Sequence, residues 1–291
     1  MQGGCRMEYA VFRNGVRMPM LGLGVFRVTD EEQCRDAVYE AIKAGYRMID
    51  TAAAYHNEAA VGEGLRKAFQ EGLVTREEMF ITSKVWVTDM GDYEHARKAL
   101  DRSLEACGLE YFDLYLLHQA MGDYFAAWRA LEDAYEEGKV RAIGISNFYP
   151  FVVVNLCEHV RILPMLNQIE THPFFTQEPA LKVMKDYGIV PEAWAPLGSG
   201  LYDIFSNELL KGIAGKYGKT VGQVVLRWNI QRGVAVIPKS VHKERIIENL
   251  NVFDFRLTDE EMSEIASLDH GYTGVRVKHL DPDYVRNSLK G

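Results

Sequence analysis

Three short apolar segments in the first half of the chain each end on a side chain that can hold or transfer a proton. Asp50 ends the first, Lys84 lies at the end of the second, and His118 follows the third. A phenol, Tyr55, follows Asp50 by five residues. If the segments are neighbouring parallel strands, their carboxyl ends meet at one rim of the sheet. The spacing therefore predicts one site that contains a carboxylate, a phenol, an ammonium group and an imidazole.

These residue types suit proton donation by a tyrosine. A free phenol has a pKa of about 10 and is a poor acid at neutral pH. An ammonium group about 4 Å away favours the phenolate by up to ~4 kcal/mol at an effective dielectric constant of about 20, or about three pK units. Lys84 is the candidate cation, Asp50 its counter-ion, and His118 the group that orients a carbonyl oxygen. Taken singly, each is more often a cap, a surface charge or a packing residue.

Strand and helix patterns alternate along the chain. The eight predicted strands lie within residues 21–25, 48–49, 80–85, 112–117, 141–145, 165–169, 189–194 and 234–237, and helical patterns follow at 57–70, 93–107 and 123–137. A capping box at residues 29–32 and the stop at Gly45 bracket the first helix. Eight such units with no low-complexity linker predict an α/β fold, a closed (β/α)8 TIM barrel.

Three further features surround this plan. The Asn14-Gly15 dipeptide between two apolar stretches predicts an N-terminal β-hairpin. Helices near 207–217 and 258–268 exceed the eight units. We expect a single domain over residues 1–291, in which residues 1–6 are a tail.

Composition excludes several classes of protein. With 47% hydrophobic and 25% charged residues, the chain has the make-up of a globular protein, and its formal net charge of -8 argues against nucleic acid as a partner. No apolar run approaches the roughly 20 residues of a membrane span, and the N-terminus lacks a signal-peptide pattern. The cysteines are far apart, which indicates free thiols in a reducing compartment: Cys5, Cys34, Cys107 and Cys157. We expect a cytoplasmic monomer or weak dimer with no membrane partner.

The motifs of three other site classes are missing. The two Gly-x-Gly pairs at Gly22 and Gly198 lack the third glycine of a dinucleotide loop. Gly144-Ile145-Ser146 does not continue into a nucleophile elbow. No His-x-His or His-Glu-x-x-His pair appears, so we predict no metal ligands. Acid chemistry without a metal remains.

Six segments resemble the aldo-keto reductases. They are residues 45–55, 81–86, 115–119, 143–148, 166–170 and 237–240, and their order and spacing match along nearly the whole chain. The likeness is greatest to the bacterial branch that includes 2,5-diketo-gluconate reductases and similar aldehyde reductases. The resemblance implies NADPH-dependent reduction of a small aldehyde or ketone. It makes Tyr55 the proton donor, with Asp50, Lys84 and His118 completing a catalytic tetrad.

The resemblance also implies that NADPH or NADP+ binds across the barrel mouth. Carried over position by position, the cofactor-binding residues are Ser146, Asn147 and Gln168 for the carboxamide, Trp194 for stacking on the nicotinamide, Pro196, Leu197, Gly198 and Ser199 for the pyrophosphate, Lys239, Ser240 and Arg245 for the 2′-phosphate, and Glu248 and Asn249 for adenine. Many family members place tyrosine where Trp194 stands, and an indole offers an equal or larger stacking face. Val25, Phe26 and Trp86 would line the substrate pocket.

This chain departs from the family pattern in two places. Gln119-Ala120 follows His118, where many relatives have a proline as the second residue. The loop at residues 198–203 has no close match. The tail after Leu268, which in the family helps to shape the substrate pocket, contains Tyr272, Val275, His279 and Tyr284.

Two alternatives remain at this stage. A nicotinamide-binding regulatory subunit could keep the barrel without turnover, although a pure binding protein has no need of a lysine beside a phenol. A metal-dependent barrel hydrolase is the weaker alternative, and insensitivity of the activity to EDTA would exclude it.

Overall fold

The computed structural model of the chain describes residues 7–200, 202–273, 279 and 281–290. The predicted tail at residues 1–6 and Val275 lie outside the described residues. Within the described part, eight parallel strands form one sheet in which each strand pairs with the one before it. They are β3 (Leu23–Gly24), β4 (Met48–Asp50), β5 (Phe80–Val85), β6 (Leu114–Leu117), β7 (Ile143–Ser146), β8 (Leu166–Glu170), β9 (Val190–Trp194) and β10 (Ala235–Val236).

The two outermost strands, β3 and β10, meet through isolated bridges and close this sheet into a barrel. Parallel bridges pair Leu21 with Val236 and Gly24 with Lys239. The N–H of Gly22 donates to the carbonyl of Val236 at 2.9 Å. Glycine is needed at position 24, because a Cβ there would lie 2.8 Å from the carbonyl oxygen of Ile237. The predicted (β/α)8 barrel is confirmed.

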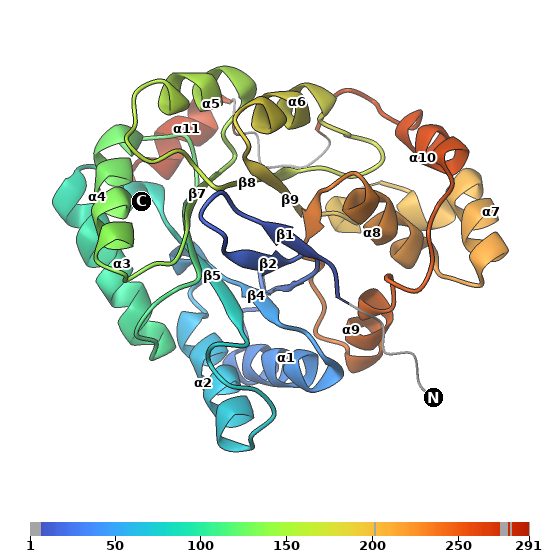
Figure 1. Cartoon of the computed structure of the whole chain (residues 1–291), viewed down its shortest axis with the longest axis horizontal. Helices are drawn as coiled ribbons and strands as arrows, with labels where there is room; N and C mark the ends of the chain where they lie inside the picture. Colours follow the sequence, from blue (N-terminus) through green and yellow to red (C-terminus); the bar gives the residue numbers. More distant parts are fainter. Residues whose placement is uncertain (1–6, 201, 274–278, 280, 291) are drawn as a thin grey trace.

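Helices surround the barrel (Figure 1). They are α1 (Glu31–Ala44), α2 (Glu58–Gln70), α3 (Tyr93–Cys107), α4 (Tyr124–Glu136), α5 (Pro150–Cys157), α6 (Glu178–Asp186), α7 (Glu208–Tyr217), α8 (Val221–Gln231), α9 (Lys243–Leu250), α10 (Asp259–Ala266) and α11 (Pro282–Ser288). The predicted bounds of α2, α3 and α4 are confirmed to within one residue. The predicted capping box at 29–32 is wrong, because the N-cap of α1 is Asp30 rather than Thr29 and it forms a single cap bond. Asp30 caps α1, because its carboxylate accepts from the N–H of Gln33 at 2.7 Å.

The extra helices α7 and α10 share an apolar cluster with α8. Trp228 on α8 is fully buried there with Ile213 and Ile265, and its indole N–H donates to the carbonyl of Met262 at 3.2 Å. Both extra helices are confirmed, whereas α11 was not predicted from the sequence. Among the described residues, the structure contains no helix both long and apolar enough for a membrane span.

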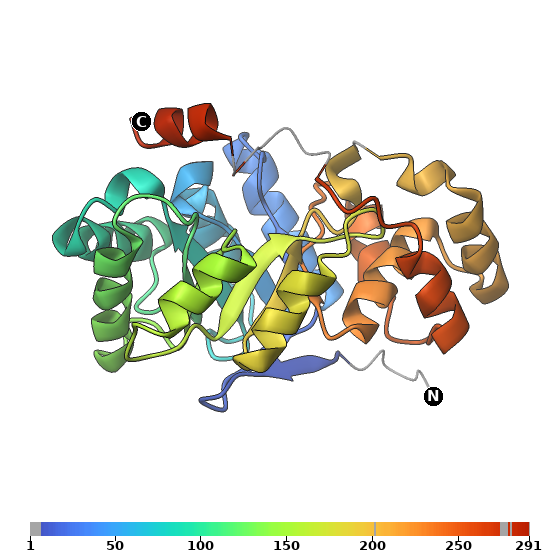
Figure 2. The same cartoon turned by 90° about the horizontal axis from the view of Figure 1, so that it is seen from above.

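The hairpin of β1 (Tyr9–Val11) and β2 (Arg17–Pro19) covers the amino ends of the barrel strands. Its turn residue Arg13 donates to the carbonyl of Tyr187, just before β9, at 2.6 Å. Asn14 donates to the carbonyl of Arg141, just before β7, at 2.9 Å. Figure 2 places the hairpin and α11 at opposite ends of the molecule. The carboxyl ends of the strands therefore lie on the side away from the hairpin.

Gly24→Ala should weaken the seam between β3 and β10. The added methyl group must displace the carbonyl of Ile237, which we expect to cost about 1–3 kcal/mol in the free energy of unfolding by urea. Gly212→Ala on α7 is the matched control, since a Cβ at that position would meet no atom within 4 Å. That change should stabilise the protein by about 0.5–1 kcal/mol. Unchanged stability of Gly24→Ala would contradict the close approach at the seam.

Candidate active site

A buried ion pair lies at the carboxyl ends of β4 and β5. The ammonium group of Lys84 is 2.7 Å from Asp50 Oδ1 and donates to the carbonyl of Thr51 at 2.8 Å. The side chain of Lys84 is 0% exposed and that of Asp50 is 2% exposed. Parallel pairing sets Asp50 opposite Thr82, so Lys84 is the next residue of β5 to face the same side. The geometry is the one that the spacing of the strand ends predicts.

Tyr55 and His118 lie on the same rim as this pair. A short 3-10 helix, Ala53–Tyr55, brings the Tyr55 hydroxyl to 3.4 Å from Lys84 Nζ. The ring of His118 meets the ring of Tyr55 edge to face at 5.6 Å and that of Trp86 at 5.0 Å. The structure thus brings the four predicted catalytic side chains together.

Burial is the largest single influence on the pKa of Tyr55, Lys84 and His118, although it does not decide the direction at Lys84. Desolvation raises the pKa of Tyr55, while Lys84 lowers it and does not outweigh the desolvation. Lys84 therefore favours the phenolate, as the sequence predicts, but the expected net fall of the pKa is absent. Burial lowers the pKa of Lys84, yet the charges of Asp50 and Tyr55 outweigh it, so the ammonium form persists. Burial holds the pKa of His118 well below its usual value, and the ring is neutral.

Gln168 connects Asp50 to a residue that sequence reasoning missed. Its amide nitrogen donates to Asp50 Oδ2 at 2.8 Å and to Glu192 Oε2 at 2.7 Å. Gln168 was predicted to bind a carboxamide, and its side-chain oxygen accepts no hydrogen bond from the described residues. A weak signal for Glu192 existed in the sequence: it precedes Trp194 by two residues, and alternate residues of a strand share a face.

Three of the other residues predicted to contact the carboxamide and the nicotinamide ring are hydrogen-bonded to one another. Asn147 donates to the carbonyl of His118 at 3.0 Å and to Ser146 Oγ at 3.1 Å. The indole N–H of Trp194 donates to Asn147 Oδ1 at 2.9 Å. Asn147 adopts a left-handed backbone with φ 61°, which an asparagine tolerates better than most residues. The half-buried indole is therefore held in a fixed orientation at the mouth.

Aromatic side chains surround the tetrad. Phe26 is 48% exposed and its ring lies 4.9 Å from that of Tyr55. Val25, also predicted for the pocket, is 0% exposed and therefore offers no surface to a substrate in this structure. His279 of the C-terminal segment lies 5.9 Å from the Trp194 ring. Tyr284 lies 5.9 Å from His279 in turn, so this segment reaches the mouth.

The loop after β9 adopts a run of left-handed backbone conformations. Gly198, Ser199 and Gly200 have φ of 68°, 53° and 71°. The preceding Pro196 is buried and Leu197 is half-buried. Pro196, Leu197, Gly198 and Ser199 are the residues predicted for the pyrophosphate. Proline has no N–H, and the N–H of Gly198 already donates to the carbonyl of Ala195 at 2.8 Å, so the remaining donors are the N–H groups of Leu197 and Ser199 and the Ser199 hydroxyl.

The residues predicted for the 2′-phosphate and adenine lie between β10 and the end of α9. Lys239 and Arg245 are exposed, and neither pairs with a carboxylate in the described part of the chain. Ser240 is buried and accepts from the N–H of His242, the cap of α9. Glu248 accepts from Thr220 at 2.8 Å, and Asn249 is buried. Two unpaired cations beside a helix N-terminus fit a phosphate group.

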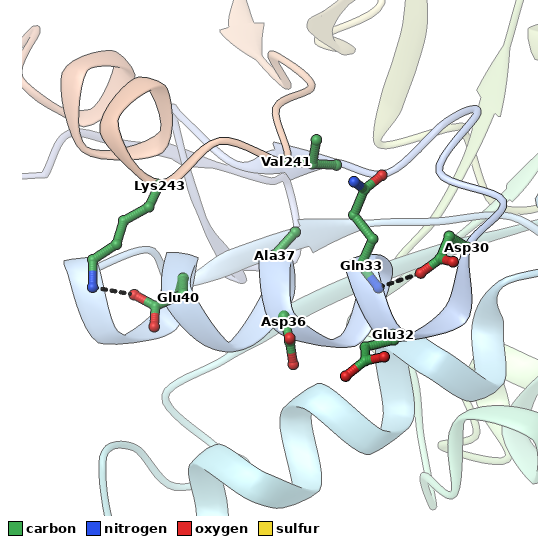
Figure 3. A pocket seen from close by; sticks show the side chains of 8 residues that line it. All are labelled: Asp30, Glu32, Gln33, Asp36, Ala37, Glu40, Val241 and Lys243. Atoms are coloured by element: carbon green, nitrogen blue, oxygen red, sulfur yellow. Dashed lines mark hydrogen bonds and ion pairs between the residues drawn. The ribbon is translucent and has the colours of Figure 1, made fainter.

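A separate hollow of about 330 Å³ lies between α1 and the start of α9 (Figure 3). Its acidic lining consists of Asp30, Glu32, Asp36 and Glu40. Lys243 is paired with Glu40 at 2.9 Å, so its charge is already compensated. None of the tetrad lines this hollow, and its carboxylates disfavour a phosphate. Among the described residues, no cluster of His, Cys, Asp and Glu is arranged to hold a metal ion.

Comparisons with known proteins match this architecture. The model of the aldo/keto reductase family matches residues 20–270. A glyoxal reductase of Bacillus subtilis is 49% identical over 257 residues, which cover 88% of this chain and 91% of that protein. The methylglyoxal reductase DkgA of Escherichia coli is 41% identical over 274 residues, 93% of this chain and 94% of that protein. A solved Bombyx mori aldo-keto reductase in complex with NADP covers 97% of each chain, with a TM-score of 0.90 and 35% identity.

The chain therefore belongs to the aldo/keto reductase family. It is an oxidoreductase that acts on carbonyl compounds.

Lys84→Met should expose the cost of the buried carboxylate. Removing the ammonium group leaves Asp50 without a cation, and we expect the free energy of unfolding at pH 7 to fall by about 3–5 kcal/mol. Burial already raises the pKa of Asp50. Without Lys84 the folded state favours the protonated form of Asp50 further. The loss of stability relative to the wild type should therefore shrink as the pH falls toward the usual pKa of a carboxyl group.

The control for this change is Lys211→Met. Lys211 pairs with Glu208 on the surface of α7, and both side chains are exposed. Its loss should change the stability by less than about 0.5 kcal/mol. A similar small effect at Lys84 would contradict the importance of the buried pair.

Proposed function

We propose that the protein reduces small aldehydes and ketones with NADPH, and that Tyr55 donates the proton. The observation that carries the proposal is the fully buried ammonium group of Lys84, held 2.7 Å from Asp50 and 3.4 Å from the Tyr55 hydroxyl. An ammonium group in this position stabilises the phenolate that forms when the phenol gives up its proton. Core packing alone does not call for such a pair, since a buried ion pair often stabilises a fold less than apolar residues do.

The residues at the mouth fit a nicotinamide dinucleotide. The indole of Trp194, fixed by Asn147, would stack on the nicotinamide ring. The side-chain oxygen of Gln168 is available to accept from the carboxamide, with Ser146 and Asn147 beside it. The loop from Pro196 to Ser199 would hold the pyrophosphate. NADP is present in the solved Bombyx mori relative, which supports the same cofactor here.

The adenosine end would lie against α9. Lys239, Ser240 and Arg245 would bind the 2′-phosphate, which favours NADPH over NADH. Glu248 and Asn249 would contact the adenine.

The reaction needs a hydride and a proton. When bound, the reduced nicotinamide would supply the hydride that the carbonyl carbon accepts. Tyr55 gives its proton to the carbonyl oxygen, and Lys84 stabilises the resulting phenolate. Asp50 keeps Lys84 charged. His118, neutral because it is buried, can donate a hydrogen bond that orients the carbonyl oxygen.

The substrate pocket would be small and largely aromatic. Phe26 and Trp86 flank Tyr55 and His118. Glyoxal and methylglyoxal are the substrates named for two relatives, which supports short aldehydes with an adjacent carbonyl as the substrate class.

Tyr55→Phe should remove the proton donor and spare the cofactor site. We expect NADPH binding within about twofold of the wild type and a loss of several powers of ten in kcat for a small aldehyde, measured by NADPH oxidation. Tyr93→Phe is the matched control, because that hydroxyl donates to Asp133 on α4 and neither residue belongs to the site. Normal turnover of Tyr55→Phe would refute the assignment. A wild type that binds NADPH but oxidises none with an aldehyde panel would favour the regulatory subunit.

Arg245→Ala should weaken the binding of NADPH but not that of NADH. The guanidinium group is a partner for the 2′-phosphate alone, so we expect the KM for NADPH to rise about tenfold or more while the KM for NADH changes little. NADH serves as the internal control. Equal effects on the two cofactors would remove the 2′-phosphate contact from the proposal.

A further inference from the structure

A second buried carboxyl group lies beside the Asp50–Lys84 pair, and the proposed reaction does not use it. Glu192 is the third residue of β9, and its side chain is 1% exposed. Its neighbours in the sheet are Gln168 on β8 and Ala235 on β10. It therefore sits in the wall of the barrel, next to the residue that contacts Asp50.

Gln168 links the two carboxyl groups through one nitrogen atom. That nitrogen donates one hydrogen to Asp50 Oδ2 and the other to Glu192 Oε2, at 2.8 and 2.7 Å. Both hydrogens are used, so the orientation of the amide is fixed. Asp50 Oδ1 accepts from Lys84, whereas Glu192 Oε1 is buried and has no hydrogen-bond partner among the described residues. The two acids are thus unequal.

A single ammonium group can neutralise only one of them. Asp50 contacts Lys84 directly, whereas Glu192 is connected to Lys84 only through Gln168 and then Asp50. A second ionised carboxylate would bear the desolvation cost of a buried charge without its own cation. Burial, and next the charge of Asp50, raise the pKa of Glu192 to about 8, so it holds a proton at neutral pH.

The charged surroundings of Glu192 come from the barrel interior. The charged groups that shift the pKa of Glu192 are Asp50 from β4 and Lys84 from β5. The paired residues of the flanking strands, Gln168 and Ala235, are neutral. Within the described residues, no charged side chain of α6, which packs on the outside of β9, acts on it.

We infer that Glu192 is a positioning residue of the proton-donating site, whose protonated carboxyl group fixes the Gln168 amide and leaves Lys84 paired with a single negative charge. The inference rests on the proposed function and deepens it. Ionisation of Glu192 places a second negative charge near Tyr55, which raises the pKa of the phenol and makes it a weaker acid. Loss of Glu192 as an acceptor lets the Gln168 amide turn, and with it the oxygen offered to the cofactor.

The first test is the pH profile of aldehyde reduction by Glu192→Gln. A neutral amide mimics the protonated acid, so kcat at pH 7 should stay within about threefold of the wild type. The wild type should lose kcat/KM above about pH 8, and in Glu192→Gln this break should move up by about one pH unit or disappear. Glu58→Gln is the matched control. Glu58 is also buried but bonds to Ser83 and Ser103, so its replacement should keep the wild-type break.

A second variant separates positioning from simple neutrality. Glu192→Met is neutral but cannot accept from Gln168. If Glu192 positions the amide, Glu192→Met should raise the KM for NADPH about fivefold or more while Glu192→Gln does not. Equal values for the two variants would overturn the positioning role.

Thermal unfolding tests, independently of activity, whether Glu192 is protonated in the folded state. The pKa of Glu192 is raised in the folded state. Its contribution to the free energy of unfolding is therefore fully present below the usual pKa of a glutamate, and it is lost as the pH rises to about 8. The melting temperature of the wild type relative to Glu192→Gln should therefore fall by about 5 °C or more between pH 5 and pH 8.

The outcomes separate the inference from the proposed function. Identical pH profiles in an active wild type and Glu192→Gln would overturn the inference and leave the proposed function standing. An inactive wild type would overturn the proposed function, and the melting comparison would still decide whether Glu192 holds a proton.

Discussion

The burial of an ammonium group at the rim of the barrel is the constraint on which the site depends. Lys84 has no exposed surface, so its charge requires a carboxylate and a carbonyl at hydrogen-bonding distance, and Asp50 and Thr51 supply them. Those partners come from the neighbouring strand. The pair therefore exists only while β4 and β5 keep their register, which is why a rigid parallel sheet is the right frame for it.

The polar connections continue around the rim from strand to strand. Gln168 on β8 reaches Asp50 on β4, and Asn147 after β7 holds the indole at the end of β9. Asn147, which holds the indole, and Ala195, which follows Trp194, both have left-handed backbone, and such conformations persist only where the surrounding structure enforces them. The opposite end is covered by the hairpin, so the polar chemistry is confined to one side of the barrel.

The sequence predicts most of what depends on local signals. Strand ends, turn dipeptides and helix periodicity predicted the barrel, the hairpin, both extra helices and the meeting of Asp50, Tyr55, Lys84 and His118. What it could not predict depends on surroundings. The pKa of Tyr55 moves upward because burial outweighs Lys84, and burial is a property of the folded chain. Glu192 was not predicted, because its only local signal is its spacing of two residues from Trp194, and that spacing does not reveal the link through Gln168. The roles of the cofactor residues rest on resemblance and remain predictions.

The placement of the tryptophans has a practical consequence. Trp128 and Trp228 are fully buried away from the rim, whereas Trp86 and Trp194 are half-buried at the mouth. The two tryptophans at the mouth therefore have surroundings that differ from those of the two buried tryptophans. Trp194 is also held by its hydrogen bond to Asn147. The intrinsic tryptophan fluorescence of the chain therefore reports on the barrel mouth. Ligand binding there can be titrated by fluorescence emission without an attached dye.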